Sequence, residues 1–342
     1  MAKQRIGYID AMRGFTMILV VYSHICRYCF GDWTMGFNDV FFLFRLPCFF
    51  FISGWLFGSE DRPMGQTIRH KFMVQIVPTV IFLLLLASPP LFFSRLGTTK
   101  GGYWFTFALF EFFLLSLFSE KYLKRWSGMV ALSISVVAYC YDVFYNSLQS
   151  SSSSFLLPLT SFLGFLSFAT WRYFLFFYIG TWVKAHFDQF QQWIGKPAVI
   201  GMVFVGFVLF ALNPRSENVV LEYVIFAVGG ILGMTLVFVL FRWLGTHHPS
   251  HTSHLFSLTS YLLKYIGQRT LDIYLLHYFV LPRFLLLYAP QLRAYDNRWL
   301  EFLVGMLLAF VVVAVCLLMS YLIRLNPFLG HYLFGVKYER QK

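Results

Sequence analysis

The chain has 342 residues, of which 58% are hydrophobic and only 12% charged, and its formal net charge is +12. Soluble domains carry about 25% charged residues, so this composition excludes an ordinary soluble protein and indicates an integral membrane protein. Basic residues beside apolar spans serve topology and lipid contacts, so the positive charge does not indicate nucleic-acid binding. No long polar stretch separates the apolar segments, and we expect one membrane domain over residues 1–342 without a separate soluble domain.

The first apolar segment, residues 12–30, contains Arg13 and His24. Ionisable side chains inside a membrane span are costly and are by default candidates for function. Their spacing of eleven residues turns a helix about 20° past three full turns and raises it about 16 Å, so both share one face. A long, thin anionic molecule would bridge them; alternatively, Arg13 anchors the helix end and His24 only packs. No A-x-A-like cleavage site follows, so we expect a true span rather than a signal peptide.

Further apolar stretches are long enough to cross a bilayer as helices, which takes roughly 17–25 residues each. The sequence predicts about ten spans, at residues 12–30, 38–57, 72–93, 103–119, 128–145, 170–186, 196–212, 220–243, 269–290 and 299–324. The expected fold class is all-α, a polytopic transmembrane helix bundle. Residues 146–170 contain a serine run that indicates a loop, with an apolar half that re-enters the membrane or lies at its interface. No internal repeat is visible, so an inverted-repeat transporter architecture is not supported.

Lysine and arginine residues predict the orientation of these spans. Most of them fall on one side if the N-terminus is cytoplasmic, and this positive-inside asymmetry predicts that both termini are cytoplasmic. Arg13 then lies at the cytoplasmic surface and His24 inside the membrane.

Other polar residues accompany Arg13 at the cytoplasmic side. Asp10 precedes it by three positions, and such a pair would hold the guanidinium in place. Arg69 and Lys71 open the third predicted span, so the three cations would form a mouth suited to phosphate groups. A contact with lipid headgroups is the simpler alternative for each of them.

A neutral imidazole at His24 can take a proton from a hydroxyl that attacks a thioester. Glu111, near the middle of the fourth predicted span, either orients His24, binds an acceptor hydroxyl, or pairs with Arg45 as structure. His277 lies about 12 Å along the ninth predicted span, deep enough to reach the level of His24. No Ser-His-Asp pattern or G-x-S-x-G elbow occurs, which favours direct transfer over a covalent serine intermediate.

Two further clusters are weaker candidates. Cys26 and Cys29 form a CxxC at the end of the first span, where packing is more common than redox or metal use. A histidine tract lies in a loop and has no cysteine or carboxylate beside it, so no metal site is expected there. Its members are His247, His248, His251 and His254.

The stretch RIGYIDAMRGFTMILVVYSH resembles the opening helix of the acyltransferase-3 family of membrane O-acyltransferases, whose signature there is Arg-x10-His. FFFISGWLFG, the basic entry to the third helix ending at Pro78, GYWFTFALFEFF, YFLFFYIGTWVK and YIGQRTLDIYLLH agree with the family in order, so the resemblance covers nearly the whole chain. It implies a helical bundle that moves an acyl group, usually acetyl, from cytoplasmic acyl-CoA to a glycan hydroxyl. Arg13 would then contact the CoA side, and His24 would act where the acyl group is transferred. Many members carry Arg-x-x-Arg at the third helix, whereas here Phe72 stands three residues after Arg69.

The leading hypothesis is an O-acetyltransferase of the bacterial inner membrane, with acetyl-CoA as donor, a cell-surface glycan or lipid-linked sugar as acceptor, and membrane lipids around it. The expected catalytic residues are His24 and Glu111, and the expected substrate-binding residues are Arg13, Asp10, Arg69, Lys71, Arg45 and His277. Two alternatives remain open: a transporter of a small organic anion, acyl group or glycan, and a non-catalytic subunit of a polysaccharide synthase. A homodimer or association with polysaccharide-synthesis proteins also remains open.

Overall fold

The computed structural model describes residues 6–57, 63–86, 100–123, 126–150, 156–246 and 254–336. Helices make up 88% of the structure, and the described residues contain no strand. The predicted all-α class is therefore confirmed. The chain divides into two compact units, one of residues 1–52 and 186–322 and the other of residues 53–185 and 323–342, with the boundary inside α2.

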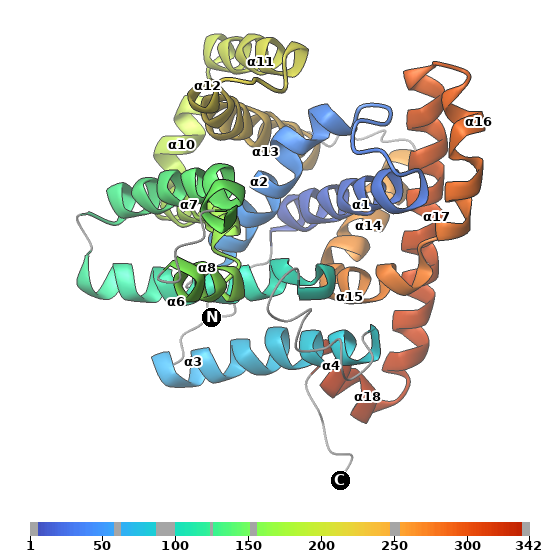
Figure 1. Cartoon of the computed structure of the whole chain (residues 1–342), viewed down its shortest axis with the longest axis horizontal. Helices are drawn as coiled ribbons and strands as arrows, with labels where there is room; N and C mark the ends of the chain where they lie inside the picture. Colours follow the sequence, from blue (N-terminus) through green and yellow to red (C-terminus); the bar gives the residue numbers. More distant parts are fainter. Residues whose placement is uncertain are drawn as a thin grey trace. The chain divides into compact units, whose positions relative to one another are not determined.

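The first unit contains Arg13 and His24, both on α1. Its helices are α1 (Gly7–Cys29), α2 (Asn38–Leu56, which continues into the second unit), α10 (Phe187–Ile194), α11 (Pro197–Leu212), α12 (Val219–Val224), α13 (Gly230–Thr246), α14 (His254–Gln268), α15 (Thr270–Val280), α16 (Ala289–Arg293) and α17 (Arg298–Arg324) (Figure 1). A π-helical turn at Ile225–Gly229 joins α12 to α13, and a 3-10 helix at Arg283–Tyr288 precedes α16.

The second unit contains the remaining helices. They are α3 (Met64–Lys71), α4 (Val77–Leu86), α6 (Trp104–Tyr122), α7 (Ser127–Ser150), α8 (Leu156–Phe165), α9 (Phe174–Ala185) and α18 (Pro327–Phe334). A π-helical turn, Phe72–Ile76, makes α3 and α4 one continuous helical stretch. Within this unit α7 packs against α9 and against the 3-10 helix Phe168–Tyr173, and α18 packs against α4.

Among the residues that the structure describes, six helical stretches are long and apolar enough to cross a membrane. They are Gly7–Cys29, Asn38–Leu56, Met64–Leu86, Ser127–Phe144, Val219–Thr246 and Arg298–Arg324. Two bent helix pairs raise the number to eight if each is one span: Phe187–Ile194 with Pro197–Leu212, bent by 80°, and Thr270–Val280 with Arg283–Arg293, bent by 59°. The chain therefore has the helices of a multi-pass membrane protein, while the count of about ten and the cytoplasmic termini stay predictions.

Several predicted spans differ from the helices found. The segment expected at 170–186 forms only the 12-residue α9, because the residues before it adopt a 3-10 helix entered through Ser167 at a φ of 51°. The segment expected at 103–119 is helical as α6 but more polar than the six spans, since it carries Glu111, Glu120 and Lys121.

Two further segments differ in where their helices begin and end. The segment expected at 269–290 breaks after Val280, where Pro282 has no N–H to continue the helix. The loop expected within 146–170 is partly helical, because α7 continues to Ser150 and α8 begins at Leu156. Residues 151–155 lie outside the described residues.

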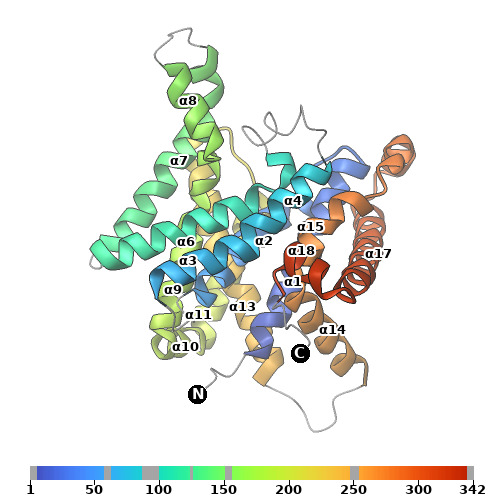
Figure 2. The same ribbon diagram turned by 90° about the horizontal axis from the view of Figure 1, so that it is seen from below.

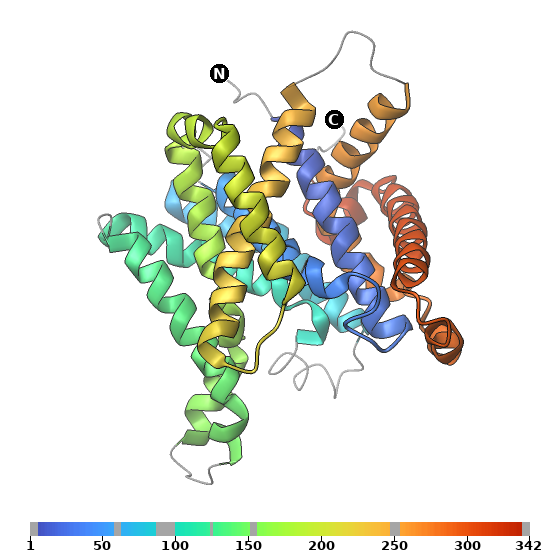
Figure 3. The same ribbon diagram turned by 90° about the horizontal axis from the view of Figure 1, so that it is seen from above.

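In the first unit α1 lies between α13 and α14 (Figures 2 and 3) and also contacts α15. Two glycines bring the backbones of α1 and α14 together. A Cβ atom added to Gly14 would lie 2.0 Å from the carbonyl oxygen of Leu263, and one added to Gly267 would lie 1.8 Å from that of Asp10. Small residues allow this close approach of helices where the surrounding lipid gives no hydrophobic drive for association. The contact holds α1 and the end of α14 in one arrangement.

Replacing Gly267 by alanine is expected to destabilise the protein by about 1–3 kcal/mol, the usual cost of overpacking a close contact. Unfolding of the purified protein in detergent, followed by circular dichroism, measures the change. Gly201→Ala on α11 is the matched control, because nothing lies within 4 Å of a Cβ added there. Equal unfolding midpoints for the two variants would contradict the assigned role of the glycine contact.

Candidate active site

Helix α1 contacts α15 through polar side chains at two levels. Nη2 of Arg13 donates a hydrogen bond to Oγ1 of Thr270 over 2.7 Å, and Nδ1 of His24 lies 2.7 Å from Nε2 of His277. Thr270 and His277 are seven residues apart, about two turns, so they lie on one face of α15. On α1 their partners Arg13 and His24 are eleven residues apart, about three turns.

The hydrogen bonds of His24 and His277 determine which nitrogen of each imidazole ring carries a proton. Nδ1 of His277 lies 3.2 Å from the carbonyl oxygen of Ile273, which can only accept, so this nitrogen carries the ring proton. Nε2 of the neutral His277 ring therefore accepts the hydrogen bond from Nδ1–H of His24. In this pattern Nε2 of His24 keeps its lone pair, and no hydrogen bond occupies it among the described residues. That atom is free to take a proton.

Burial differs between the two rings. His277 is completely buried, whereas His24 is half-buried. The two ring planes are nearly parallel, with an interplanar angle of 6° and centroids 4.8 Å apart. Tyr278 packs against both rings, at 4.1 Å from His277 and 5.2 Å from His24. The inner ring is thus rigidly enclosed, and the outer ring is the accessible one.

Arg45 on α2 is another buried ionisable residue of the first unit, and 4% of it is exposed. Its Nη1 donates to Oδ1 of Asn38 over 2.9 Å, and its guanidinium carbon lies 5.0 Å from the centre of the Phe42 ring. The guanidinium of Arg45 is therefore held at the start of α2 by a side-chain hydrogen bond and a ring contact.

Glu111 belongs to the second unit and has partners there. Its Oε2 accepts a hydrogen bond of 2.8 Å from Nε1 of Trp171, and its charge interacts with that of Lys100. Burial lowers the pKa of Lys100, an effect that the charge of Glu111 partly opposes. The second unit therefore contains a partly buried carboxylate, an indole and an amine as one polar cluster.

Residues 6–321 match the family model described as an acyltransferase domain. The chain belongs to the acyltransferase-3 family. The match covers nearly the whole chain, and with the apolar helices it identifies a membrane acyltransferase. A comparison with curated proteins and one with solved structures find no match.

The expected site residues of this acyltransferase fall into the two units. His24, His277, Arg13, Asp10 and Arg45 belong to the first, and the first three take part in the contacts between α1 and α15. Asp10 is buried in the first turn of α1. Its pairing with Arg13 stays a prediction.

The basic residues at the third predicted span belong to the second unit. Arg69 is exposed on α3, and Nζ of Lys71 lies 6.0 Å from the centre of the Phe113 ring. That Arg69 and Lys71 bind the same anionic molecule as Arg13 stays a prediction. In the histidine tract, residues 247–253 lie outside the described residues.

Two residues that position this site were missed by the sequence interpretation. Thr270 receives the hydrogen bond of Arg13, and its place two helical turns before His277 is a signal that the sequence contains. Asn38 holds Arg45, and its position one residue before Asp39 at the start of α2 indicates only a helix start.

Proposed function

We propose that this protein is an O-acetyltransferase of the bacterial inner membrane. It moves an acetyl group from cytoplasmic acetyl-CoA to a hydroxyl of a cell-surface glycan or lipid-linked sugar. The observation that carries the proposal is the pair of His24 and His277, whose hydrogen bonds leave one basic nitrogen of His24 free among the described residues. Membership of an acyltransferase family favours group transfer over transport.

In the proposed reaction His24 acts as general base. Its Nε2 takes the proton of the acceptor hydroxyl while the hydroxyl oxygen attacks the thioester carbon. The resulting tetrahedral intermediate collapses, the bond from carbon to sulfur breaks, and the CoA thiolate takes the proton back from Nε2. The products are the acetyl ester and CoA with a free thiol, and no covalent enzyme intermediate forms.

His277 acts through His24 in this scheme, as a positioning residue. Its Nε2 holds the proton of Nδ1 of His24, which keeps the basic nitrogen facing away from His277. The same contact stabilises the imidazolium after proton transfer, because Nε2 of His277 remains an acceptor. An orienting third group behind a catalytic histidine is a recurrent arrangement in acyl transfer.

Arg13 is proposed to bind phosphate groups of CoA at the cytoplasmic end of α1. The helix is continuous from Gly7 to Cys29, so the rise from Arg13 to His24 is about 16 Å, close to the length of a pantetheine arm. Arg69 and Lys71 are proposed as additional phosphate contacts from the second unit.

The acceptor is proposed to bind at Glu111 in the second unit. A carboxylate accepts hydrogen bonds from sugar hydroxyls, and the neighbouring Trp171 offers a large apolar ring together with an N–H that fixes the carboxylate. In this proposal Glu111 acts on the acceptor. The proposed reaction requires acetyl-CoA as its only cosubstrate.

The donor half of the proposal predicts a specific defect in Arg13→Gln. Loss of a charged hydrogen bond to phosphate costs about 1.5–3 kcal/mol, so the KM for acetyl-CoA should rise about 10- to 100-fold. Membrane vesicles supplied with labelled acetyl-CoA and an acceptor glycan extract measure the rate. S-acetyl-pantetheine, which lacks the phosphates, is the matched donor and should be used equally by the variant and the wild type.

Two outcomes would contradict the proposal. An equal increase of KM for both donors would mean that Arg13 does not bind the phosphates. Flux of acetate or glycan in proteoliposomes without any CoA thioester, and no labelled ester, would instead favour a transporter.

A further inference from the structure

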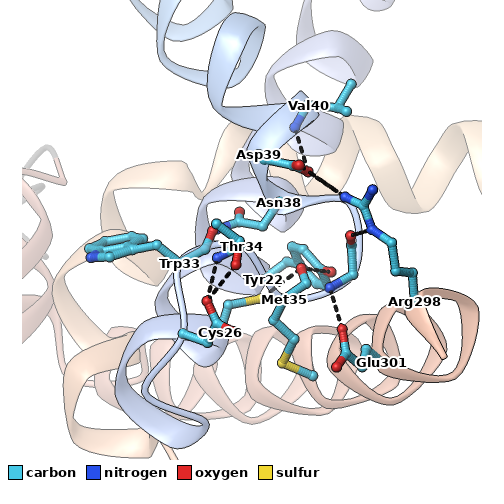
Figure 4. Close-up of polar contacts among 12 residues, drawn as sticks. Tyr22, Cys26, Trp33, Thr34, Met35, Asn38, Asp39, Val40, Arg298 and Glu301 are labelled. Carbon is cyan, nitrogen blue, oxygen red and sulfur yellow. Dashed lines mark hydrogen bonds and ion pairs between the residues drawn. The ribbon is translucent and has the colours of Figure 1, made fainter. Parts of the chain in front are cut away.

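Two arginines of the first unit differ in how far the protein itself satisfies their guanidinium groups. Arg298, at the start of α17, donates to both carboxylate oxygens of Asp39 and to the carbonyl oxygen of Gly36, each over 2.9 Å (Figure 4). Nη1 of Arg269 is buried, yet no residue in the described part of the chain accepts a hydrogen bond from it. A buried charged donor without an acceptor costs stability, so this nitrogen indicates a place for an anion.

Arg269 lies at the junction of α14 and α15, beside the first half of α1. The next residue, Thr270, accepts the hydrogen bond of Arg13, and consecutive Cα atoms are only about 3.8 Å apart. At the same junction a Cβ added to Gly267 would lie 1.8 Å from the carbonyl oxygen of Asp10. Arg13 and Arg269 thus bring two positive charges to one helix junction, and an anion bound there would offset their repulsion.

The guanidinium of Arg269 is the end of a row of stacked groups on α14. Its central carbon lies 4.8 Å from the centre of the Tyr265 ring. Tyr265 in turn stacks on Tyr261, with ring centroids 6.5 Å apart and an interplanar angle of 19°. The two tyrosines are four residues apart, so they share one face of α14, and 64% of Tyr261 is exposed. This α14 row, made of Tyr261, Tyr265 and Arg269, therefore has an accessible aromatic ring at one end and a guanidinium at the other.

An aromatic ring and a guanidinium in one row suit a nucleotide. Purine bases stack on aromatic side chains, and arginine binds phosphate oxygens through two parallel hydrogen bonds. The phosphate of a lipid headgroup would satisfy Arg269 equally well, but it would leave the stacked tyrosines without a role. The α14 row therefore favours a phosphate that is joined to a base.

We propose that the α14 row is the nucleotide subsite for acetyl-CoA. Arg269 binds the pyrophosphate together with Arg13, and the adenine ring stacks on Tyr261, which Tyr265 supports. The inference rests on the proposed acetyl transfer and extends its donor site from α1 to α14. The parts of the donor then follow the order of the residues: the thioester lies at His24, the pantetheine arm along α1 and the nucleotide along α14. No bond forms or breaks at the α14 row.

Tyr261→Leu tests the contact with adenine. Loss of a stack between a base and an aromatic ring should raise the Kd for CoA about 5- to 100-fold, whereas Tyr261→Phe keeps the ring and should bind like the wild type. Isothermal titration calorimetry of the purified protein in a phosphate-free detergent measures the Kd. Tyr321→Leu on α17 is the matched control, because 55% of Tyr321 is exposed and it lies outside the row.

Arg269→Gln tests the contact with phosphate. The Kd for CoA and the KM for acetyl-CoA should rise about 10- to 100-fold, while the KM for S-acetyl-pantetheine, which lacks the nucleotide, stays unchanged. Adenosine 3′,5′-bisphosphate, the nucleotide part of CoA, should compete with acetyl-CoA in the wild type and lose this effect in the variant. Arg283→Gln is the matched control, because Arg283 also lies over a tyrosine, Tyr28 at 5.9 Å, but follows the other end of α15.

Three outcomes would overturn the nucleotide subsite. An unchanged Kd for CoA in Tyr261→Leu would do so even if Arg269→Gln does not fold. Equal losses with S-acetyl-pantetheine would show a defect that does not depend on the nucleotide. An Arg269→Gln variant that binds CoA normally in detergent, but is less thermally stable than the wild type only in lipid nanodiscs, would assign the guanidinium to a lipid phosphate.

The binding and transfer assays separate this inference from the proposed function. If the wild type transfers label from acetyl-CoA but Tyr261→Leu and Arg269→Gln keep its Kd and KM, only the nucleotide subsite is rejected. If the wild type transfers no acetyl group while both variants lose CoA binding, the proposed acetyl transfer is rejected and the α14 row remains a nucleotide site.

Discussion

Replacing His24 by alanine is expected to lower kcat for acetyl transfer by about 10²- to 10⁴-fold, the range that general bases contribute. The physical reason is that Nε2 of His24 is the nitrogen of the hydrogen-bonded pair left free to take the hydroxyl proton. Initial rates of label transfer from acetyl-CoA in membrane vesicles measure the loss. Full acetylation of the acceptor by this variant would remove His24 from the mechanism.

His24→Asn separates base chemistry from packing. The asparagine amide reaches the position of Nδ1 and can still donate to Nε2 of His277, but it has no basic nitrogen. We therefore expect the asparagine variant to be as inactive as the alanine variant. Its KM for acetyl-CoA should stay close to that of the wild type, where residual activity permits the measurement, because Arg13 is unchanged.

Replacing His277 by phenylalanine is the second change with a large expected effect, a loss in kcat of about 10²-fold or more. Phenylalanine fills the buried position but leaves Nδ1–H of His24 without an acceptor, so the ring is no longer held in one tautomer and orientation. Incorrect orientation or tautomer of a catalytic histidine is costly even when the residue itself is present.

His277→Gln is the conservative variant that distinguishes positioning from simple filling of space. The glutamine carbonyl oxygen reaches the place of Nε2 and accepts the same hydrogen bond from His24. We expect it to recover most of the activity that the phenylalanine variant loses. If His277→Gln is as inactive as His277→Phe, while both variants fold and bind acetyl-CoA, then His277 does not act only by accepting the hydrogen bond at its Nε2.

Helix periodicity predicts part of the contact between α1 and α15, while the roles of its residues stay predictions. Arg13 and His24 were expected on one face of a single helix, and both contact α15. The depth of His277 followed from helix rise alone. The contact between the two histidines did not follow, because it depends on how α1 and α15 are packed. Gly14 and Gly267 bring α1 close to α14, the helix just before α15, and they carry no chemical signal of their own.

The class of fold was predictable from apolar composition, but the helix boundaries were less so. α14 was not predicted, because its residues 254–268 are too polar to read as a span, yet it is the main neighbour of α1. The breaks at Ser167 and Pro282 shortened or bent two predicted spans. Hydropathy detects burial in lipid or protein alike, so it cannot distinguish a membrane-crossing helix from a shorter packed one.

The continuity of α1 from Gly7 to Cys29 has a consequence for the proposed donor. Because Arg13 and His24 lie on this one unbroken helix, the interval between them is fixed by the helix itself. In the proposed reaction this interval matches the length of the pantetheine arm that carries the acyl group, and it does not depend on the acyl group itself. Under the proposed function, donors with other acyl groups would therefore share a thiol arm of the same length.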